Sequence, residues 1–127
     1  MDNIVAHSLE KLYRELIEID QNFLDSDLKD MDSYEESLAK ATKHAVTEHM
    51  QAMYNSIDEA LCKDICRDKQ YMIQRHDKRE LFTVNGVICF NHTLFQKRED
   101  GRCHYLLDEG LGLDPHERLS SSARQRY

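Results

Sequence analysis

The segment LFTVNGVICF, residues 81–90, places two apolar, β-favouring runs on either side of Asn85 and Gly86. Asn-Gly is a preferred dipeptide of two-residue hairpin loops, because both residues tolerate positive φ. We therefore predict an antiparallel hairpin with Asn85 and Gly86 as its loop. Both faces of this hairpin are apolar near the turn, so we expect helices to cover one of them. The predicted register pairs Val84 with Val87, Thr83 with Ile88, Phe82 with Cys89, and Leu81 with Phe90.

The sequence after the hairpin predicts a third strand and the start of a helix. Residues 98–101, REDG, are typical of a turn and lead into a strand at residues 102–107. The glycines at 110 and 112 predict a strand-exit turn with unusual backbone angles. Asp114, Pro115 and Glu117 then carry the cues of a helix start, and the serines at 120–122 offer a second cap.

The sequence before the hairpin predicts two long antiparallel helices, since the first 85 residues contain neither glycine nor proline. The second helix is expected to begin at the capping box formed by Ser33 and Glu36 and to run to about Arg67. The first helix has an apolar stripe wide enough to pack against a partner helix rather than form a narrow two-stranded seam. This stripe consists of Val5, Leu9, Leu12, Leu16, Ile19 and Phe23, widened by Ile4, Tyr13, Ile17 and Leu24.

The predicted fold class is α+β, with two long helices, a small antiparallel three-stranded sheet and a short C-terminal helix start. We expect 127 residues to form a single domain with a helical part at 1–69, a β part at 70–113 and a helical segment at 114–127 that is cut short. No run is apolar enough for a membrane span and no signal peptide is evident, so a cytoplasmic protein is expected. Four cysteines without a secretory signal favour free thiols over disulfides.

Charge divides the chain unevenly. Residues 1–68 carry 16 acidic residues against 7 Lys and Arg, a net charge of −9, whereas residues 69–127 carry 8 against 10, a net charge of +2. The acidic half is therefore a poor nucleic-acid surface, and the other half is a possible one.

Three motifs in the second half resemble a known family. They are KRELFTVNGVICF at 78–90, YLLDEGLGL at 105–113 and ERLS at 117–120. Together they resemble the N-terminal part of the ISLre-type insertion-sequence transposases, long catalogued as an uncharacterised family. The resemblance covers about residues 70–124, and the helical half is similar only in general character. After the strand phenylalanine, where family members tend to have basic residues, this chain has Asn91, His92 and Thr93, a poor set for binding phosphates.

The resemblance implies a DNA-handling protein. Full-length members carry, further along, a nuclease-like domain that uses acidic residues and a divalent metal. We expect this chain to end before that domain, as the front portion of a transposase without strand-transfer activity and without a cofactor of its own. The alternative from the residues alone is a helical oligomerisation or protein-interaction module that makes no DNA contact. No membrane or small-molecule partner is expected.

Basic residues around the hairpin and the second turn are the candidate DNA contacts, since Lys and Arg neutralise phosphates. Acidic residues lie between these basic residues in the sequence. The alternative to DNA contact is therefore a solvated strand edge of mixed charge, which discourages aggregation between sheets. The candidates are Arg75, Lys78, Arg79, Lys97, Arg98 and Arg102.

Other groups of residues give weaker evidence for a catalytic or metal-binding site. Asp108 and Glu109 would point to opposite faces of a strand, so we do not expect a catalytic pair. His44 and His49 do not share a helical face and are expected on the surface. A zinc site can be imagined, but the short Cys-x-x-Cys knuckle is absent, so no metal is predicted. The ligands of such a zinc site would be drawn from Cys62, Cys66, Cys89, Cys103, His92 and His104.

Overall fold

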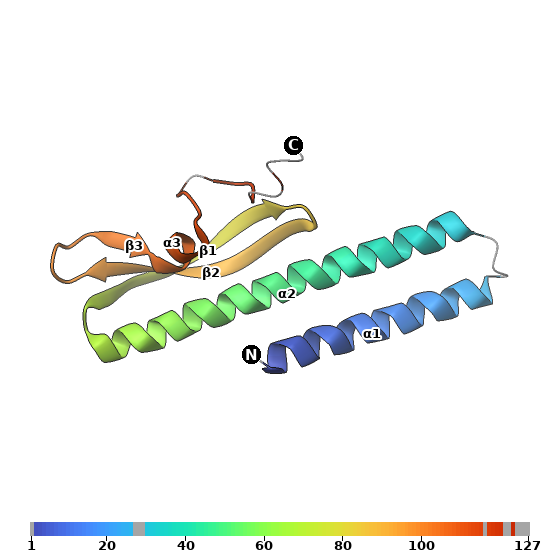
Figure 1. Ribbon diagram of the computed structural model, residues 1–127, viewed down its shortest axis with the longest axis horizontal. Helices are drawn as coiled ribbons and strands as arrows, with labels where there is room; N and C mark the ends of the chain where they lie inside the picture. Colours follow the sequence, from blue (N-terminus) through green and yellow to red (C-terminus); the bar gives the residue numbers. More distant parts are fainter. Residues whose placement is uncertain (1, 27–29, 116, 121–122, 124–127) are drawn as a thin grey trace.

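The computed structural model describes residues 2–26, 30–115, 117–120 and 123. These residues form an α+β fold of the predicted class, with two long helices, a three-stranded antiparallel sheet and a short helix. Helix α2 lies between the sheet and α1, so that α1 is the outermost layer and runs antiparallel to α2 (Figure 1). The elements are α1 (Asp2–Asp25), α2 (Met31–Asp68), β1 (Tyr71–Thr83), β2 (Gly86–Lys97), β3 (Cys103–Tyr105) and α3 (Leu106–Leu111).

Helix α2 begins earlier than the capping box predicts. The carboxylate of Asp30 accepts a hydrogen bond from the backbone N–H of Ser33 at 2.9 Å, which makes Asp30 the N-cap and Met31 the first helical residue. The predicted cap at Ser33 was therefore wrong. Aspartate is as effective an N-cap residue as serine, and it also places a negative charge at the positive end of the helix dipole. The helix ends at Asp68, where Lys69 turns into the left-handed region with φ 58°.

The hairpin forms where the sequence predicts it, with a different loop. Val84 and Asn85 form the loop, and Gly86 is the first residue of β2, paired with Thr83. The Thr83 hydroxyl donates to the Gly86 carbonyl at 2.7 Å and accepts from the Asn85 N–H at 3.2 Å. Among residues 83–86, only Gly86 has a positive φ, 137°, so the type I′ turn that suits Asn-Gly, which needs positive φ at both loop residues, is not formed.

The register is therefore shifted by two residues from the prediction. Leu81 pairs with Ile88 instead of Phe90, and Phe82 pairs with Val87 instead of Cys89. A shift of two leaves every side chain on its predicted face, because strand side chains alternate with a period of two.

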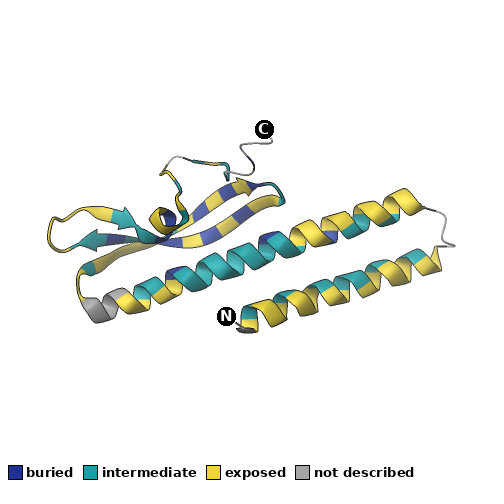
Figure 2. Ribbon diagram, in the orientation of Figure 1, coloured by how far each residue is buried: buried dark blue, intermediate teal, exposed yellow. Residues whose placement is uncertain are grey.

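The hydrophobic core lies on one face of this hairpin, as predicted. Four residues are buried there, and Tyr54 of α2 meets the Phe90 ring edge-on with centroids 5.2 Å apart. The opposite face near the turn stays exposed at Phe82 and Val87. Figure 2 shows buried residues alternating along both strands above α2. The core consists of Leu81, Ile88, Phe90 and Leu107, packed by Met50, Tyr54, Ile57, Leu61, Leu111 and Leu113.

Side chains of α2 also cap the open edge of β2. Strand β3 pairs only with residues 94–96, so the earlier part of β2 has no strand neighbour on that side. Three side chains of α2, spaced by four and then three residues, accept the backbone N–H groups of alternate β2 residues. An edge N–H needs such a partner where water is excluded, and capping it also prevents edge-to-edge pairing. The bonds join Gln51 to Cys89 at 2.8 Å, Asn55 to Asn91 at 2.7 Å and Asp58 to Thr93 at 2.9 Å.

The third strand is shorter than predicted. The second turn lies at residues 98–100, as predicted, and Cys103 pairs with Gln96. Strand β3 stops at Tyr105, however, and the residues predicted as strand end and exit turn form α3 instead. Leu107 and Leu111 lie four residues apart and turn toward the core, which favours a helix. Gly112, with φ 72°, caps that helix in the left-handed conformation.

The segment after Gly112 adds to the outer edge of β1. Leu119 forms a parallel bridge with Phe82, through hydrogen bonds of 2.7 Å and 2.9 Å on either side of it. The helix predicted from Asp114 is wrong for the described residues, because residues 117–120 are not helical and Asp114 bonds Glu117 only within a turn. The Ser120 hydroxyl does accept from the Ala123 N–H at 3.1 Å, as a cap would. His116, Ser121, Ser122 and residues 124–127 lie outside the described residues.

None of the helices in this described part of the chain combines the length and the apolar character that crossing a bilayer requires.

Candidate functional site

The buried charges of the sheet half form one cluster around Asp108 of α3. Its Oδ2 accepts a hydrogen bond from Arg79 Nη1 at 2.8 Å and lies 2.9 Å from His92 Nδ1. Asp108, Arg79 and His92 are all buried, and Asp108 Oδ1 has no hydrogen-bond partner among the described residues. A buried carboxylate is tolerated only with such partners, so the cluster fixes α3 against the hairpin.

Arg79 also holds the segment that follows α3. Its Nη2 donates to the backbone carbonyls of Asp114 at 2.8 Å and Glu117 at 2.6 Å. The three motifs noted in the sequence therefore meet at one guanidinium: Arg79 belongs to the first, Asp108 to the second and Glu117 to the third. A planar guanidinium with five donors is suited to joining a carboxylate and two carbonyls.

A second polar group lies beside this cluster. Asp77 Oδ2 accepts from Arg75 Nε and from the Tyr105 hydroxyl, each at 2.7 Å, and the Tyr105 ring stacks on His92 with centroids 4.0 Å apart. The hydrogen bond from Tyr105, followed by that from Arg75, holds the pKa of Asp77 below its usual value. Burial, followed by the bond to Asp77, raises the pKa of Tyr105. The group thus links β1, β2 and β3.

The adjacent acids Asp108 and Glu109 do not converge on a substrate. Glu109 is exposed and lies 2.8 Å from His104 Nδ1, whereas Asp108 points into the cluster. They diverge as expected, but on a helix rather than on a strand. Sequence reasoning missed Asp108 as the partner of Arg79, because nothing in the local pattern relates residues 29 positions apart.

A cleft of about 440 Å³ lies between part of α2 and the hairpin. Beside it, the buried Thr93 hydroxyl donates to Asp58 Oδ2 at 2.7 Å, lies 3.0 Å from His76 Nδ1 and accepts from Cys62 Sγ at 3.3 Å. The hydrogen bonds of Thr93 with Asp58, His76 and Cys62 indicate a structural network that joins α2 to the hairpin. The cleft is lined by Asn55, Asp58, Glu59, Cys62, His76, Asp77, Lys78 and Asn91.

The six residues predicted to contact DNA differ in burial and in ion pairing. Arg79 is buried in the cluster, so it is unsuited to contact a phosphate and we withdraw it from the set. Arg75 is exposed but paired with Asp77, and Lys97 lies 4.0 Å from Glu99. Lys78, Arg98 and Arg102 are exposed. The second turn brings Lys97, Arg98 and Arg102 together, and DNA contact by the five remaining residues stays a prediction.

The cysteines and histidines are scattered. Cys89 and Cys103 are exposed on β2 and β3, while Cys62 lies on α2 and lines the cleft between α2 and the hairpin. The side chain of Cys66 lies outside the described residues. Among the side chains that are described, no three His, Cys, Asp or Glu residues are grouped as metal ligands would be.

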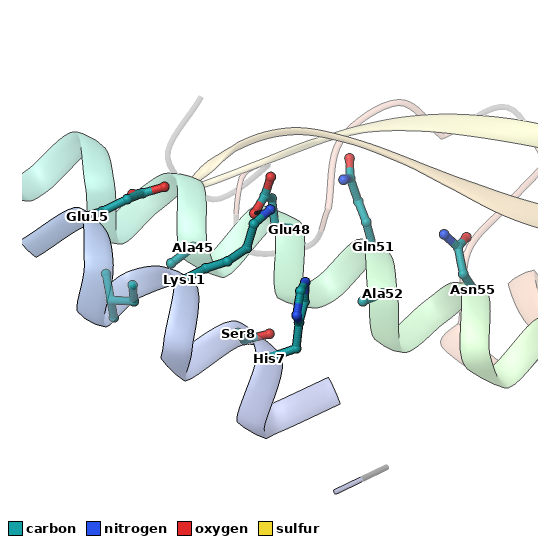
Figure 3. A pocket seen from close by; sticks show the side chains of 10 residues that line it. His7, Ser8, Lys11, Glu15, Ala45, Glu48, Gln51, Ala52 and Asn55 are labelled. Atoms are coloured by element: carbon teal, nitrogen blue, oxygen red, sulfur yellow. Dashed lines mark hydrogen bonds and ion pairs between the residues drawn. The ribbon is translucent and has the colours of Figure 1, made fainter. Parts of the chain in front are cut away.

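A second cleft, of about 270 Å³, lies between α1 and α2 (Figure 3). Lys11 Nζ lies 2.9 Å from Glu48 Oε2, and His44 Nε2 lies 3.1 Å from Glu48 Oε1. The hydrogen bond from Lys11 lowers the pKa of Glu48. Ser8 Oγ lies 2.8 Å from His49 Nδ1, so His49 takes part in the contact between the helices and is only half-exposed.

The fold and the cluster define a class of protein: an α+β module in which a three-stranded sheet, backed by a long helix, is braced by a buried arginine. Its sequence matches the profile described as "Uncharacterised protein family (UPF0236)" over residues 24–127, and the chain therefore belongs to that family. This match begins well before the motifs and includes α2, so the kinship extends further than the residues 70–124 expected from the motifs.

Similar proteins occur in Caldanaerobacter subterraneus subsp. tengcongensis. One UPF0236 protein, whose name joins eleven locus designations, is 34% identical over 77 residues, which is 61% of this chain and 16% of that protein. UPF0236 protein TTE2489 of the same organism is 31% identical over 77 residues, 61% of this chain and 17% of that protein. The matched part of this chain therefore spans about a sixth of the length of these relatives. No solved structure matches the chain.

Proposed function

We propose that this chain is the DNA-binding or assembly part of a transposase-like protein. The observation that carries the proposal is the repeated encoding of its relatives. One is named for eleven loci of a single organism, and another for four. A protein encoded at many loci of one genome is expected of an element that copies itself. The resemblance of the motifs between residues 78 and 120 to ISLre-type transposases supports the same proposal.

The second turn is the surface that we propose for DNA contact. Lys97, Arg98 and Arg102 lie on it, and the hydrogen bond of 2.9 Å from Arg98 N to the Gln70 carbonyl brings Lys69 alongside. The hairpin tip, by contrast, exposes Phe82 and Val87 and carries no charge. Glu99 and Asp100 share the turn with the basic residues, so we expect modest phosphate binding that falls steeply with salt.

A mobility-shift titration tests this proposal with duplex DNA from the ends of the genetic element that carries the gene. The variant Lys97→Ala/Arg98→Ala/Arg102→Ala should bind more weakly. It should also flatten the dependence of log K on log salt by about 0.9 for each phosphate that the variant no longer neutralises. The matched control, Arg14→Ala/Lys40→Ala/Lys43→Ala, removes the same charge from the acidic helices and should bind like the parent. Absence of a shift, or equally weakened binding in both variants, would contradict the proposal.

The proposal assigns no strand transfer to these 127 residues. Incubation of the protein with the same duplex and Mg²⁺ should leave both strands intact. Cleaved or joined products would require a catalytic assignment that the cluster around Asp108 does not suggest.

The second candidate function is a helical interaction module without DNA contact. It is favoured by the apolar side chains that α1 turns away from the rest of the chain.

A further inference from the structure

The second turn, between β2 and β3, closes with a glycine bulge. Gly101 has φ 71° and donates its N–H to the Lys97 carbonyl at 2.8 Å, while the Lys97 N–H donates to the Arg102 carbonyl at 2.8 Å. Two residues of the returning chain thus oppose one residue of β2, with a left-handed glycine first, which is the G1 type of bulge. Figure 1 shows the turn at the end of the sheet farthest from the hairpin tip. The bulge places Arg102 opposite Lys97.

The bulge leaves the Arg102 N–H without a partner in the strand ladder, because Gly101 already occupies the Lys97 carbonyl. Asp100 supplies the missing acceptor: its Oδ1 accepts the Arg102 N–H at 3.0 Å. A carboxylate that accepts an N–H two residues further along is a common way to stabilise a turn. The Gln96 side chain also donates to the Gly101 carbonyl at 3.0 Å. Arg102 is therefore held at both its backbone N–H and its carbonyl.

The turn thus fixes two cations opposite one another. Like charges that face each other across two strands repel, so the pair is unfavourable unless an anion contacts both side chains. A backbone phosphate of DNA is such an anion, and Lys and Arg are its usual partners. Glu99 offsets the repulsion only weakly, since its Oε2 lies 4.0 Å from Lys97 Nζ and its side chain is 84% exposed.

We infer that Asp100 is a positioning residue for the proposed DNA contact. Its carboxylate holds Arg102 opposite Lys97 and so supports phosphate binding, although its negative charge opposes that binding. Glu99, by contrast, pairs loosely with Lys97 and acts through its charge alone. The two adjacent acids of the turn therefore have different effects on DNA binding. The role of Asp100 rests on the function proposed above, and its test separates the two.

The test compares Asp100→Asn with Asp100→Ala in mobility shifts on the element-end duplex. Asp100→Asn loses the charge but keeps the oxygen that accepts the Arg102 N–H, so it should bind at least as tightly as the parent. Asp100→Ala has the same net charge without the acceptor and should bind about 2- to 10-fold more weakly than Asp100→Asn, the range expected for one exposed hydrogen bond. Equal binding by the two variants would overturn the role of Asp100 and leave the proposed function intact. A parent that gives no shift would overturn both.

Glu99 provides the matched control. Glu99→Gln and Glu99→Ala should both bind DNA more tightly than the parent, because each removes a charge that repels phosphate. They should also bind equally to one another, since Glu99 is assigned no positioning role. A gap between them as large as the gap at residue 100 would overturn the assignment, because it would arise without the Asp100 hydrogen bond.

Two further measurements show whether Asp100 acts through Arg102. In an Arg102→Ala background, the difference in DNA affinity between Asn and Ala at position 100 should vanish, and a difference that persists would contradict the inference. In the free protein, the Arg102 amide should exchange faster with solvent in Asp100→Ala than in Asp100→Asn or the parent. Equal exchange rates would show that the carboxylate does not hold Arg102. Equal circular dichroism of the variants confirms that the fold is intact in each comparison.

Discussion

The two sides of helix α2 are packed in different ways. Toward the sheet, its side chains join the hydrophobic core and cap three backbone groups of β2. Toward α1, the contact combines half-buried apolar side chains, such as Phe23 stacked on Tyr34 with ring centroids 4.2 Å apart, with partly exposed pairs. One such pair is Lys11 with Glu48, whose side chains are 50% and 33% exposed. Buried groups contribute far more than exposed ion pairs. The difference teaches that the fully buried cluster lies between α2 and the sheet, whereas the contact between α2 and α1 is only half-buried.

The largest effect is expected from breaking the buried cluster. Asp108→Ala leaves the Arg79 guanidinium buried without its carboxylate and should lower the free energy of unfolding by about 3–5 kcal/mol. Urea unfolding followed by circular dichroism measures this change. The neighbouring Glu109→Ala removes only an exposed partner of His104 and should change the stability by about 0.5 kcal/mol or less. Equal destabilisation in the two variants would show that the buried cluster around Asp108 stabilises the fold no more than the exposed pair of Glu109 and His104.

An intermediate effect is expected at the edge of β2. Asn55→Ala removes the acceptor of the exposed Asn91 N–H and should cost about 0.5–1.5 kcal/mol, the net contribution of a hydrogen bond whose donor water can reach. Ser8→Ala removes a comparable bond on the α1 side and should cost less than about 1 kcal/mol. Hydrogen exchange of the Asn91 amide should be faster in the first variant and unchanged in the second. Unchanged exchange in Asn55→Ala would show that the cap does not protect the edge.

The smallest effect is expected on acidification of the α1 contact. The folded pKa of Glu48 is lowered, chiefly by Lys11, so its stabilising contribution is present above the unfolded pKa and is lost as pH falls through the folded pKa. The same sign holds for Asp77, whose pKa is lowered by Tyr105 and Arg75. Stability measured from about pH 6 down to about pH 3 should therefore decline less steeply in Glu48→Gln than in the parent. Parallel curves would mean that the pair contributes nothing to folding.

Local signals predicted much of the fold. The glycine-free first half with its apolar stripe predicted two helices, and the Asn-Gly turn between apolar runs predicted a hairpin with a covered face. These features follow from backbone preference and hydrophobic spacing, which act over a few residues. The exact loop, Val84 and Asn85, did not follow, because the Thr83 hydroxyl bonds both the Gly86 carbonyl and the Asn85 N–H and so stabilises the shorter turn.

The burial and the partners of the site residues were harder to predict from the sequence than the helices and strands. Arg79 appeared among the basic surface residues because its neighbours in sequence are charged, and only the fold places it beside Asp108, His92 and two carbonyls. The residues at 106–111 looked like a strand end, yet Leu107 and Leu111 reach the core only as a helix.

The sequence by itself determined the α+β class, the order of the elements and the kinship carried by its motifs, because periodicity and turn chemistry are local. Tertiary structure alone decided what those motifs do: it brings Arg79, Asp108 and Glu117 to one buried joint from positions as far as 38 residues apart. The physical reason is that burial of a charge is settled by which distant groups surround it. Tertiary structure likewise decides which apolar side chains of α1 stay exposed, because α2 covers only one side of that helix (Figure 1).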